Sequence, residues 1–229
     1  MTLLFFQGLA DTAKKVTEIL EPEKKMKIFD LLANGGPLMI PLALLLLLAI
    51  FFFIERVLAI NKASKIDGNF MNIIRDNIVT GNVTAARSLA KNTDNAVGRI
   101  IDKGLQRIGK PIEAIEKSME NVGKLEMYKM ERNVSILSIV AGMAPMVGFL
   151  GTIFGMIQLF SNINSTGKFD LNTIAGGIYV KMITSATGLI IGLLAYVAYN
   201  YLNTQIDKTA NKMEASSSEF LDILQEPTK

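Results

Sequence analysis

Three long stretches without a charged residue constrain the fold of this chain more than any other feature. The first covers residues 37–54, the second lies within 133–167 and the third within 182–206. A helix needs about 20 mostly apolar residues to cross a hydrocarbon core about 30 Å thick, and each stretch is long enough. The rest of the chain is too small to wrap three such segments in a soluble core. We therefore expect three membrane-spanning helices.

The residue types that are missing narrow the possible chemistry. The chain has no cysteine and no histidine. Disulfides, thiolate metal sites, Ser-His-Asp hydrolases and histidine-based metalloproteases are therefore excluded. No phosphate-binding loop or nucleophile–base pair is present either. We expect no enzymatic activity, no catalytic residue, no metal site and no cofactor.

The distribution of basic residues predicts how the chain is oriented. Residues 55–132 hold 14 Lys and Arg, whereas the connection over 161–173 holds one. Basic loops stay on the cytoplasmic side, so three spans put the N-terminus outside and the C-terminus inside. This indicates a multi-pass membrane protein with an external N-terminus and a cytoplasmic C-terminus. Ten acidic residues are interleaved with those 14 basic ones, which indicates a solvated helical surface and no nucleic-acid site.

Helical spacing of apolar residues continues outside the three stretches. It predicts short helices within 57–131, with breaks at 81–82, 92–95 and 109–111. The helix that starts after Pro111 shows no strong breaker, so we expect it to enter the second span uninterrupted and to bend at Pro145. Residues 202–224 have heptad-like spacing and should extend the third span as a helix. The N-terminal segment has one apolar face, typical of a helix lying on the outer membrane surface or packed on the protein.

The chain is therefore predicted to be all-α, a polytopic membrane protein whose second and third transmembrane helices extend into a cytoplasmic helical bundle. The predicted parts are an external amphipathic segment (1–34), transmembrane helix 1 (35–56), a cytoplasmic helical domain (57–131), transmembrane helix 2 (132–160), an external loop (161–173), transmembrane helix 3 (174–202) and a cytoplasmic C-terminal helix (203–229).

Glycine and hydroxyl side chains share faces of the second and third spans. Small residues allow membrane helices to approach closely, and each face contains a GxxxG pattern. Ordinary packing explains either pattern alone, but two such faces that also carry hydroxyls suggest a polar seam. The glycines expected to pack are Gly148, Gly151, Gly155, Gly188 and Gly192. The residues expected to line the seam are Thr152, Thr184, Ser185, Thr187 and Lys181, and the lysine is placed to reach the outer membrane surface.

No Asp or Glu lies inside the three predicted spans. Ion and proton carriers usually need a titratable carboxylate at membrane depth. If this chain conducts protons, a partner must supply that carboxylate. The hydroxyls of Thr152, Thr184 and Ser185 could then hydrogen-bond to it or order a chain of water.

The spans also resemble a known family. AGMAPMVGFLGTIFGMIQLF (141–160) and AGGIYVKMITSATGLIIGLLAYVAYNYL (175–202) resemble the second and third transmembrane signatures of the MotA/TolQ/ExbB proton-channel family. The segment GGPLMIPLALLLLLAIFFFIERVLAI (35–60) is similar to the first span of ExbB proteins. The order of the three segments matches over essentially the whole chain.

The resemblance implies a pore-forming stator subunit of a proton-driven motor, a multi-pass protein of the bacterial inner membrane with a periplasmic N-terminus and a cytoplasmic C-terminus. ExbB proteins form homopentamers around the single-span protein ExbD, whose intramembrane Asp carries protons to drive TonB and outer-membrane transport. By that resemblance, Thr152 corresponds to a pore threonine, and Ser185 stands where the family usually has another threonine. Val180 stands where many relatives carry a pore-facing Glu, which marks a departure from the family pattern. Partners implied are further copies of the chain, ExbD-like and TonB-like proteins, and membrane lipids.

Other functions remain open at this stage. Length and the N-terminal extension fit ExbB best, but a TolQ-like or motility-type stator of the same family shares the same signatures. A non-conducting membrane scaffold explains the glycine faces but not the hydroxyls. A secondary transporter is disfavoured because three spans lack both a carboxylate and an inverted repeat.

Overall fold

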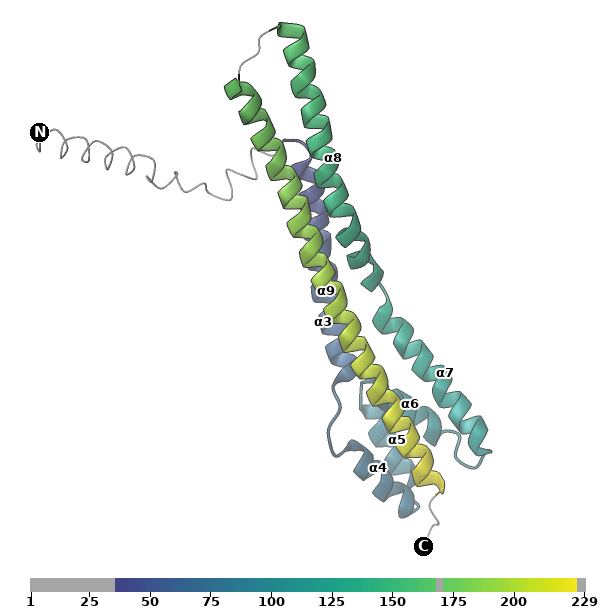
Figure 1. Ribbon diagram of the computed structural model, residues 1–229. Helices are drawn as coiled ribbons and strands as arrows, with labels where there is room; N and C mark the ends of the chain where they lie inside the picture. The colour runs from purple at the N-terminus through teal and green to yellow at the C-terminus, as the bar shows by residue number, and fades with distance from the viewer. Residues whose placement is uncertain (1–35, 168–170, 226–229) are drawn as a thin grey trace, which may run out of the picture.

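The computed structural model describes residues 36–167 and 171–225, and every regular element in these ranges is an α-helix. Three helices set the length of the molecule and lie side by side (Figure 1): α3 (Met39–Ser64), α8 (Val134–Thr166) and α9 (Leu171–Gln225). Each contains a segment long and apolar enough to cross a membrane. The predicted all-α class with three membrane helices is confirmed. The amphipathic segment predicted over residues 1–34 lies outside the described residues.

The longest helix runs through both parts of the molecule. At 1.5 Å per residue, the 55 residues of α9 span about 80 Å, more than twice the thickness of a bilayer core. Its first half packs along α8 and α3, and its second half descends into a bundle of shorter helices (Figure 1). The predicted extension of the third span into the helical bundle is therefore present.

The connection between α8 and α9 is shorter than the external loop predicted over 161–173. Helix α8 continues to Thr166, and α9 begins at Leu171. Gly167 ends α8 in the left-handed conformation (φ +62°), and its N–H donates to the carbonyl of Ile163 at 2.9 Å. The Asn and Ser residues before it are polar but do not break a helix. Polarity in this stretch therefore marks the limit of the apolar segment and not the end of the helix.

Four shorter helices and the second half of α9 form what we call the charged bundle. Asn82 caps α5 (Val83–Asn92) by accepting a hydrogen bond from the N–H group of Ala85 (3.2 Å). Asn95 caps α6 (Ala96–Leu105) by accepting one from the N–H group of Gly98 (2.6 Å). Phe220 is fully buried in the core of the bundle, where its ring reaches Gly104. The four helices are α4 (Phe70–Val79), α5 (Val83–Asn92), α6 (Ala96–Leu105) and α7 (Ile112–Glu131).

A buried carboxylate joins α6 to α7 inside the charged bundle. Glu126 is 3% exposed and accepts hydrogen bonds from Arg99 at 2.6 Å and Lys129 at 2.7 Å. Burial raises the pKa of the Glu126 carboxyl, but the two cations outweigh that effect and hold the pKa below its ordinary value. The carboxylate is therefore ionised at neutral pH and links the two helices.

Helices α7 and α8 are separate, whereas the sequence predicted one continuous helix. The break falls at Asn133, which adopts a left-handed conformation (φ +64°) that asparagine tolerates better than most residues. Arg56 of α3 lies against this break and is 6% exposed. It pairs with Glu55 and donates from Nη1 to the carbonyl of Lys129 at 3.0 Å, which satisfies an end group of α7. The break is therefore accompanied by a contact from α3, which is distant in the sequence. No Gly or Pro at the break indicates it in the sequence.

Candidate functional site

Glycines make the contact between α8 and α9 along the apolar half of the molecule. A Cβ atom added at Gly188 would lie 2.5 Å from the carbonyl oxygen of Ala144 and 2.9 Å from Cα of Gly148. Both distances are too short for any side chain, so the two backbones touch here. Such an approach is what small residues provide in membrane helix pairs.

The same contact continues in both directions from Gly188. Toward the connection between the helices, Gly151 packs against the methyl group of Thr184, which is 1% exposed. One turn further, the aliphatic part of Lys181 lies directly over Gly155. All five predicted packing glycines are found in this contact, since Gly192 packs against the ring of Pro145 at the other end.

One edge of the α8–α9 contact is covered by α3. The side chain of Leu38, at the start of α3, reaches Gly151. On α9, the positions that face α3 line an apolar groove of about 550 Å³ and follow the spacing Ile191, Leu194, Ala198 and Tyr201. Thr187 stands four residues before Ile191 and belongs to the same stripe. Its hydroxyl is half-buried and donates to the carbonyl of Ile183 at 2.9 Å.

The other edge of the contact carries no helix from residues 36–167 or 171–225. A shallow groove of about 430 Å³ runs along it, lined by a stripe on each helix. Steps of four and three residues extend both stripes beyond the groove. On α8 the stripe is Ser138, Gly142, Pro145, Phe149 and Thr152; on α9 it is Ser185, Leu189, Gly192, Tyr196 and Tyr199.

Thr152 and Ser185 end these two stripes within about one helical turn of each other. Gly151 touches Thr184, and Thr152 and Ser185 are the next residues on the two helices. Both side chains are half-buried, and the Thr152 hydroxyl donates to the carbonyl of Phe149 at 2.6 Å. We call this side of the α8–α9 pair, opposite α3, the open hydroxyl edge.

The structure thus sorts the predicted seam residues into four positions. Thr152 and Ser185 lie on the open hydroxyl edge, Thr184 is buried in the glycine contact, and Thr187 faces the α3 side. Lys181 is half-buried over Gly155, at the level where α3 begins, since its Nζ atom would lie 3.8 Å from a Cβ added at Gly36. The sequence analysis had placed all five residues in one polar seam, because residues that share a helical face cannot be separated by spacing alone.

Three further hydroxyls on this edge were missed from the sequence. Ser138, Tyr196 and Tyr199 line the groove beside Pro145 and Gly192. The signal was present, because they continue the stripes of Thr152 and Ser185 toward the charged bundle. Their distance from the glycine motifs kept them out of the predicted set.

The membrane-depth parts of these helices hold no acid. Helix α8 contains no charged residue, and α9 contains only Lys181 before Asp207. Within residues 36–167 and 171–225 there is also no cluster of three or more carboxylates, histidines or cysteines that could hold a metal. The open hydroxyl edge can therefore donate and accept hydrogen bonds, but it has no group that changes charge near neutral pH.

Comparison with known proteins gives one family. Residues 92–215, which run from the end of α5 to the second half of α9, match the model of the MotA/TolQ/ExbB proton channel family. This match includes both helices of the glycine contact and the whole open hydroxyl edge.

Several named proteins are similar to the chain. A putative biopolymer transport protein ExbB homolog of Methanothermobacter thermautotrophicus is 24% identical, with 82% of this chain and 67% of that protein aligned. A putative biopolymer transport protein ExbB-like 1 of Synechocystis sp. is 26% identical, with 85% and 78% aligned. The Tol-Pal system protein TolQ of Pseudomonas aeruginosa is 27% identical over 49% of each chain.

Proposed function

The chain belongs to the MotA/TolQ/ExbB proton channel family, and we propose that it is the pore-forming stator subunit of an ExbB-like, proton-driven inner-membrane motor. The family assignment supports a membrane-embedded, stator-like role within a complex. Our proposal adds that proton influx through this complex is coupled, by an ExbD-like and a TonB-like partner, to transport across the outer membrane. It assigns no catalytic residue and no cofactor.

The observation that carries the proposal is the open hydroxyl edge. Thr152 and Ser185 stand together on the side of the α8–α9 pair that α3 leaves free, in a region without any carboxylate. Because none of the three spans carries an acid, we infer that a partner supplies the titrating group. A partner helix with an intramembrane Asp, placed along this edge, would bring its carboxylate within reach of both hydroxyls.

The two hydroxyls would act on that carboxylate in a simple way. When the Asp is ionised, they donate hydrogen bonds to it and offset part of the cost of a charge at membrane depth. When the Asp takes up a proton, the same oxygens accept its hydrogen bond. The glycine contact keeps α8 and α9 in register, so the two hydroxyls stay within about one helical turn of each other. Buried Thr184 supports this register and does not reach the edge.

The charge pattern supports an orientation for the complex. We propose that the charged bundle lies in the cytoplasm and that the α8–α9 connection lies in the periplasm, because 14 basic residues fall between the first two spans. Lys181 then lies near the outer membrane surface, where its ammonium group can reach water while its stem covers Gly155. This placement keeps the single intramembrane cation away from the level of Thr152.

The branch of the family and the oligomeric state are also proposals. The pentamer rests on the resemblance to ExbB, and the match to TolQ keeps a TolQ-like or motility-type stator as the second candidate. A non-conducting scaffold would use the glycine contact equally well. The scaffold gives no reason for two neighbouring hydroxyls on the free edge.

Affinity purification from the native membrane tests this proposal. We expect the tagged chain to retain a small protein with one transmembrane helix and an Asp within it, in a fixed ratio measured by native mass spectrometry. Recovery of the chain in an oligomer without such a protein, under conditions that preserve a control membrane complex, would favour the scaffold.

A further inference from the structure

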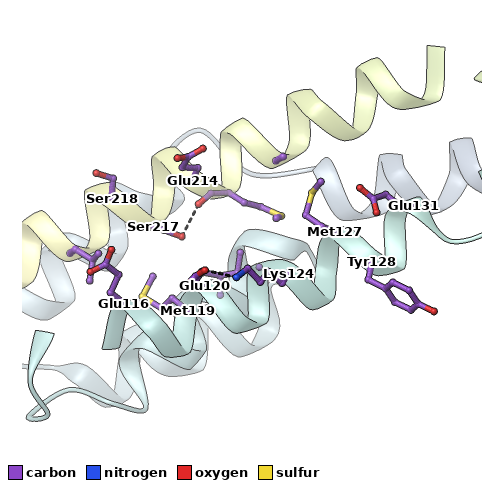
Figure 2. A pocket seen from close by; sticks show the side chains of 15 residues that line it. Glu116, Met119, Glu120, Lys124, Met127, Tyr128, Glu131, Glu214, Ser217 and Ser218 are labelled. Atoms are coloured by element: carbon purple, nitrogen blue, oxygen red, sulfur yellow. Dashed lines mark hydrogen bonds and ion pairs between the residues drawn. The ribbon is translucent and has the colours of Figure 1, made fainter. Parts of the chain in front are cut away.

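A groove of about 580 Å³ lies in the charged bundle, between α7 and the second half of α9 (Figure 2). Methionine side chains from both helices line it, and Gly123 leaves room at the middle of α7. The methionines are Met119, Met127 and Met213. Methionine side chains adapt to the shape of an apolar group that packs on them. The groove is therefore suited to receive an apolar side chain from outside the chain.

The rim of this groove is acidic. Four carboxylates and one lysine border it. The lysine, Lys124, is already paired with Glu120. Glu131 and Glu214 form no ion pair within the described part of the chain. These two carboxylates favour a partner that brings positive charge, so the groove fits an apolar group flanked by Lys or Arg.

The groove continues the open hydroxyl edge along α9. Three residues of α9 that line the edge are each followed, 18 residues later, by a residue that lines the groove. Eighteen residues make about five full helical turns, and α9 is unbroken over this interval, so both sets lie on one face of the helix. The two sets are Gly192, Tyr196 and Tyr199, and Ala210, Glu214 and Ser217. A partner that follows the open hydroxyl edge out of the membrane therefore arrives at the groove.

The membrane determines the chemistry of such a partner at that level. Lys and Arg gather on the cytoplasmic side of a span, within about 15–20 residues of its end. Ala210 lies 11 residues beyond Tyr199, which is about 17 Å along α9. The groove thus begins within reach of the basic flank of a helix that lies against the open hydroxyl edge. Its acidic rim has the complementary charge.

We propose that this groove binds the cytoplasmic flank of the single-span partner, a basic segment with an apolar side chain that packs on the methionines. This inference rests on the proposed stator function and gives the partner a second contact besides the hydroxyls. A contact in the charged bundle fixes how far the partner helix enters the membrane. It therefore fixes the level of the partner's carboxylate beside Thr152 and Ser185.

Photo-cross-linking in native membranes tests the contact. The full tagged chain would carry p-benzoylphenylalanine in place of Ser218, an exposed residue that lines the groove. We expect irradiation to join this position to the single-span protein. Mass spectrometry should place the junction within about 20 residues of the cytoplasmic end of that protein's span. The matched control carries the same amino acid at Lys91, which is exposed on α5, and should give at least tenfold less product.

Charge reversal at the rim provides a second measurement. Glu131→Lys combined with Glu214→Lys should lower the yield of the product from position 218 at least fivefold, because like charges then meet. Glu219→Lys is the control, since Glu219 is exposed on the same helix but does not line the groove. It should leave the yield unchanged. Native mass spectrometry of each variant would report whether the oligomer itself is intact.

The other outcomes overturn the proposed contact in distinguishable ways. A product that joins two copies of the chain would show that the groove is a contact between subunits. An intact complex with its single-span partner, but with no product from position 218 to that partner's cytoplasmic flank, would refute this contact and leave the stator function standing. The same holds if the yield is equal in the charge-reversal variant. A complex that holds no single-span protein would refute both.

Discussion

Replacing Thr152 by Val and Ser185 by Ala in one chain should abolish proton-driven transport while the complex stays assembled. Valine keeps the shape of threonine, and both new side chains are compatible with the apolar helix pair. The change removes the two hydroxyls of the open hydroxyl edge. A hydrogen bond to a charged group is worth about 1.5–3 kcal/mol, so losing two should slow proton transfer at least about a hundredfold. Energised transport in cells and native mass spectrometry of the purified complex would measure the two effects separately.

Thr187→Val is the matched control for this experiment. The hydroxyls of Thr187 and Thr152 both donate to a carbonyl of their own helix, but Thr187 lies on the α3 side. We expect this variant to retain transport. Full activity in the double variant, or a loss as large in Thr187→Val, would contradict the assignment of the edge.

Replacing Gly188 by Leu should prevent α8 and α9 from packing and remove the complex from the membrane fraction. Even the first side-chain atom would lie 2.5 Å from a backbone oxygen, and a backbone cannot move aside as a side chain can. Overpacking a tight contact costs roughly 1–3 kcal/mol for small additions and more for a leucine. The amount of assembled complex, followed by size-exclusion chromatography in detergent and by protease resistance, would report the loss.

Gly142→Leu provides the comparison for the glycine contact. Gly142 lies in the same helix, but a Cβ there would meet nothing within 4 Å. This variant should assemble like the unaltered chain, although its place in the groove of the open hydroxyl edge allows a change in transport. Equal assembly of the Gly188 and Gly142 variants would show that close backbone approach is not needed.

The three spans could be predicted because their signal is composition over a long window. Membrane thickness sets the length that an apolar segment needs, and each of the three helices is long and apolar enough to cross. The ends of the helices were less predictable. Helix α3 continues eight residues past the predicted limit at Arg56, and α8 continues to Thr166, because a helix can leave the bilayer without stopping. Hydropathy reports where the lipid ends and contains no information on where the backbone changes direction.

The break between α7 and α8 shows what a local pattern cannot contain. The break occurs at Asn133, which has no glycine or proline beside it, and the apolar spacing continues from α7 into α8 without interruption. The partner of the break is Arg56, 73 residues from the carbonyl it binds. Such a contact depends on how α3 packs against the other helices, which the spacing within one helix does not specify.

The candidate site was predictable in its residue types but not in its geometry. Shared faces on each helix identified Thr152, Thr184, Ser185 and Thr187 together. Only the position of α3 separates them, because it covers the stripe of Thr187 and leaves that of Thr152 and Ser185 free. The sequence therefore predicted a polar seam, and the third helix decides which side of it a partner can reach.

Proton flux into liposomes tests the central claim most directly, namely that this chain shapes a pathway without owning its titrating group. With an imposed pH gradient and membrane potential, the purified chain alone should give no flux above empty liposomes. The chain reconstituted with its single-span partner should conduct, and changing the partner's intramembrane Asp to Asn should stop the flux. Robust flux through the chain alone would contradict the account.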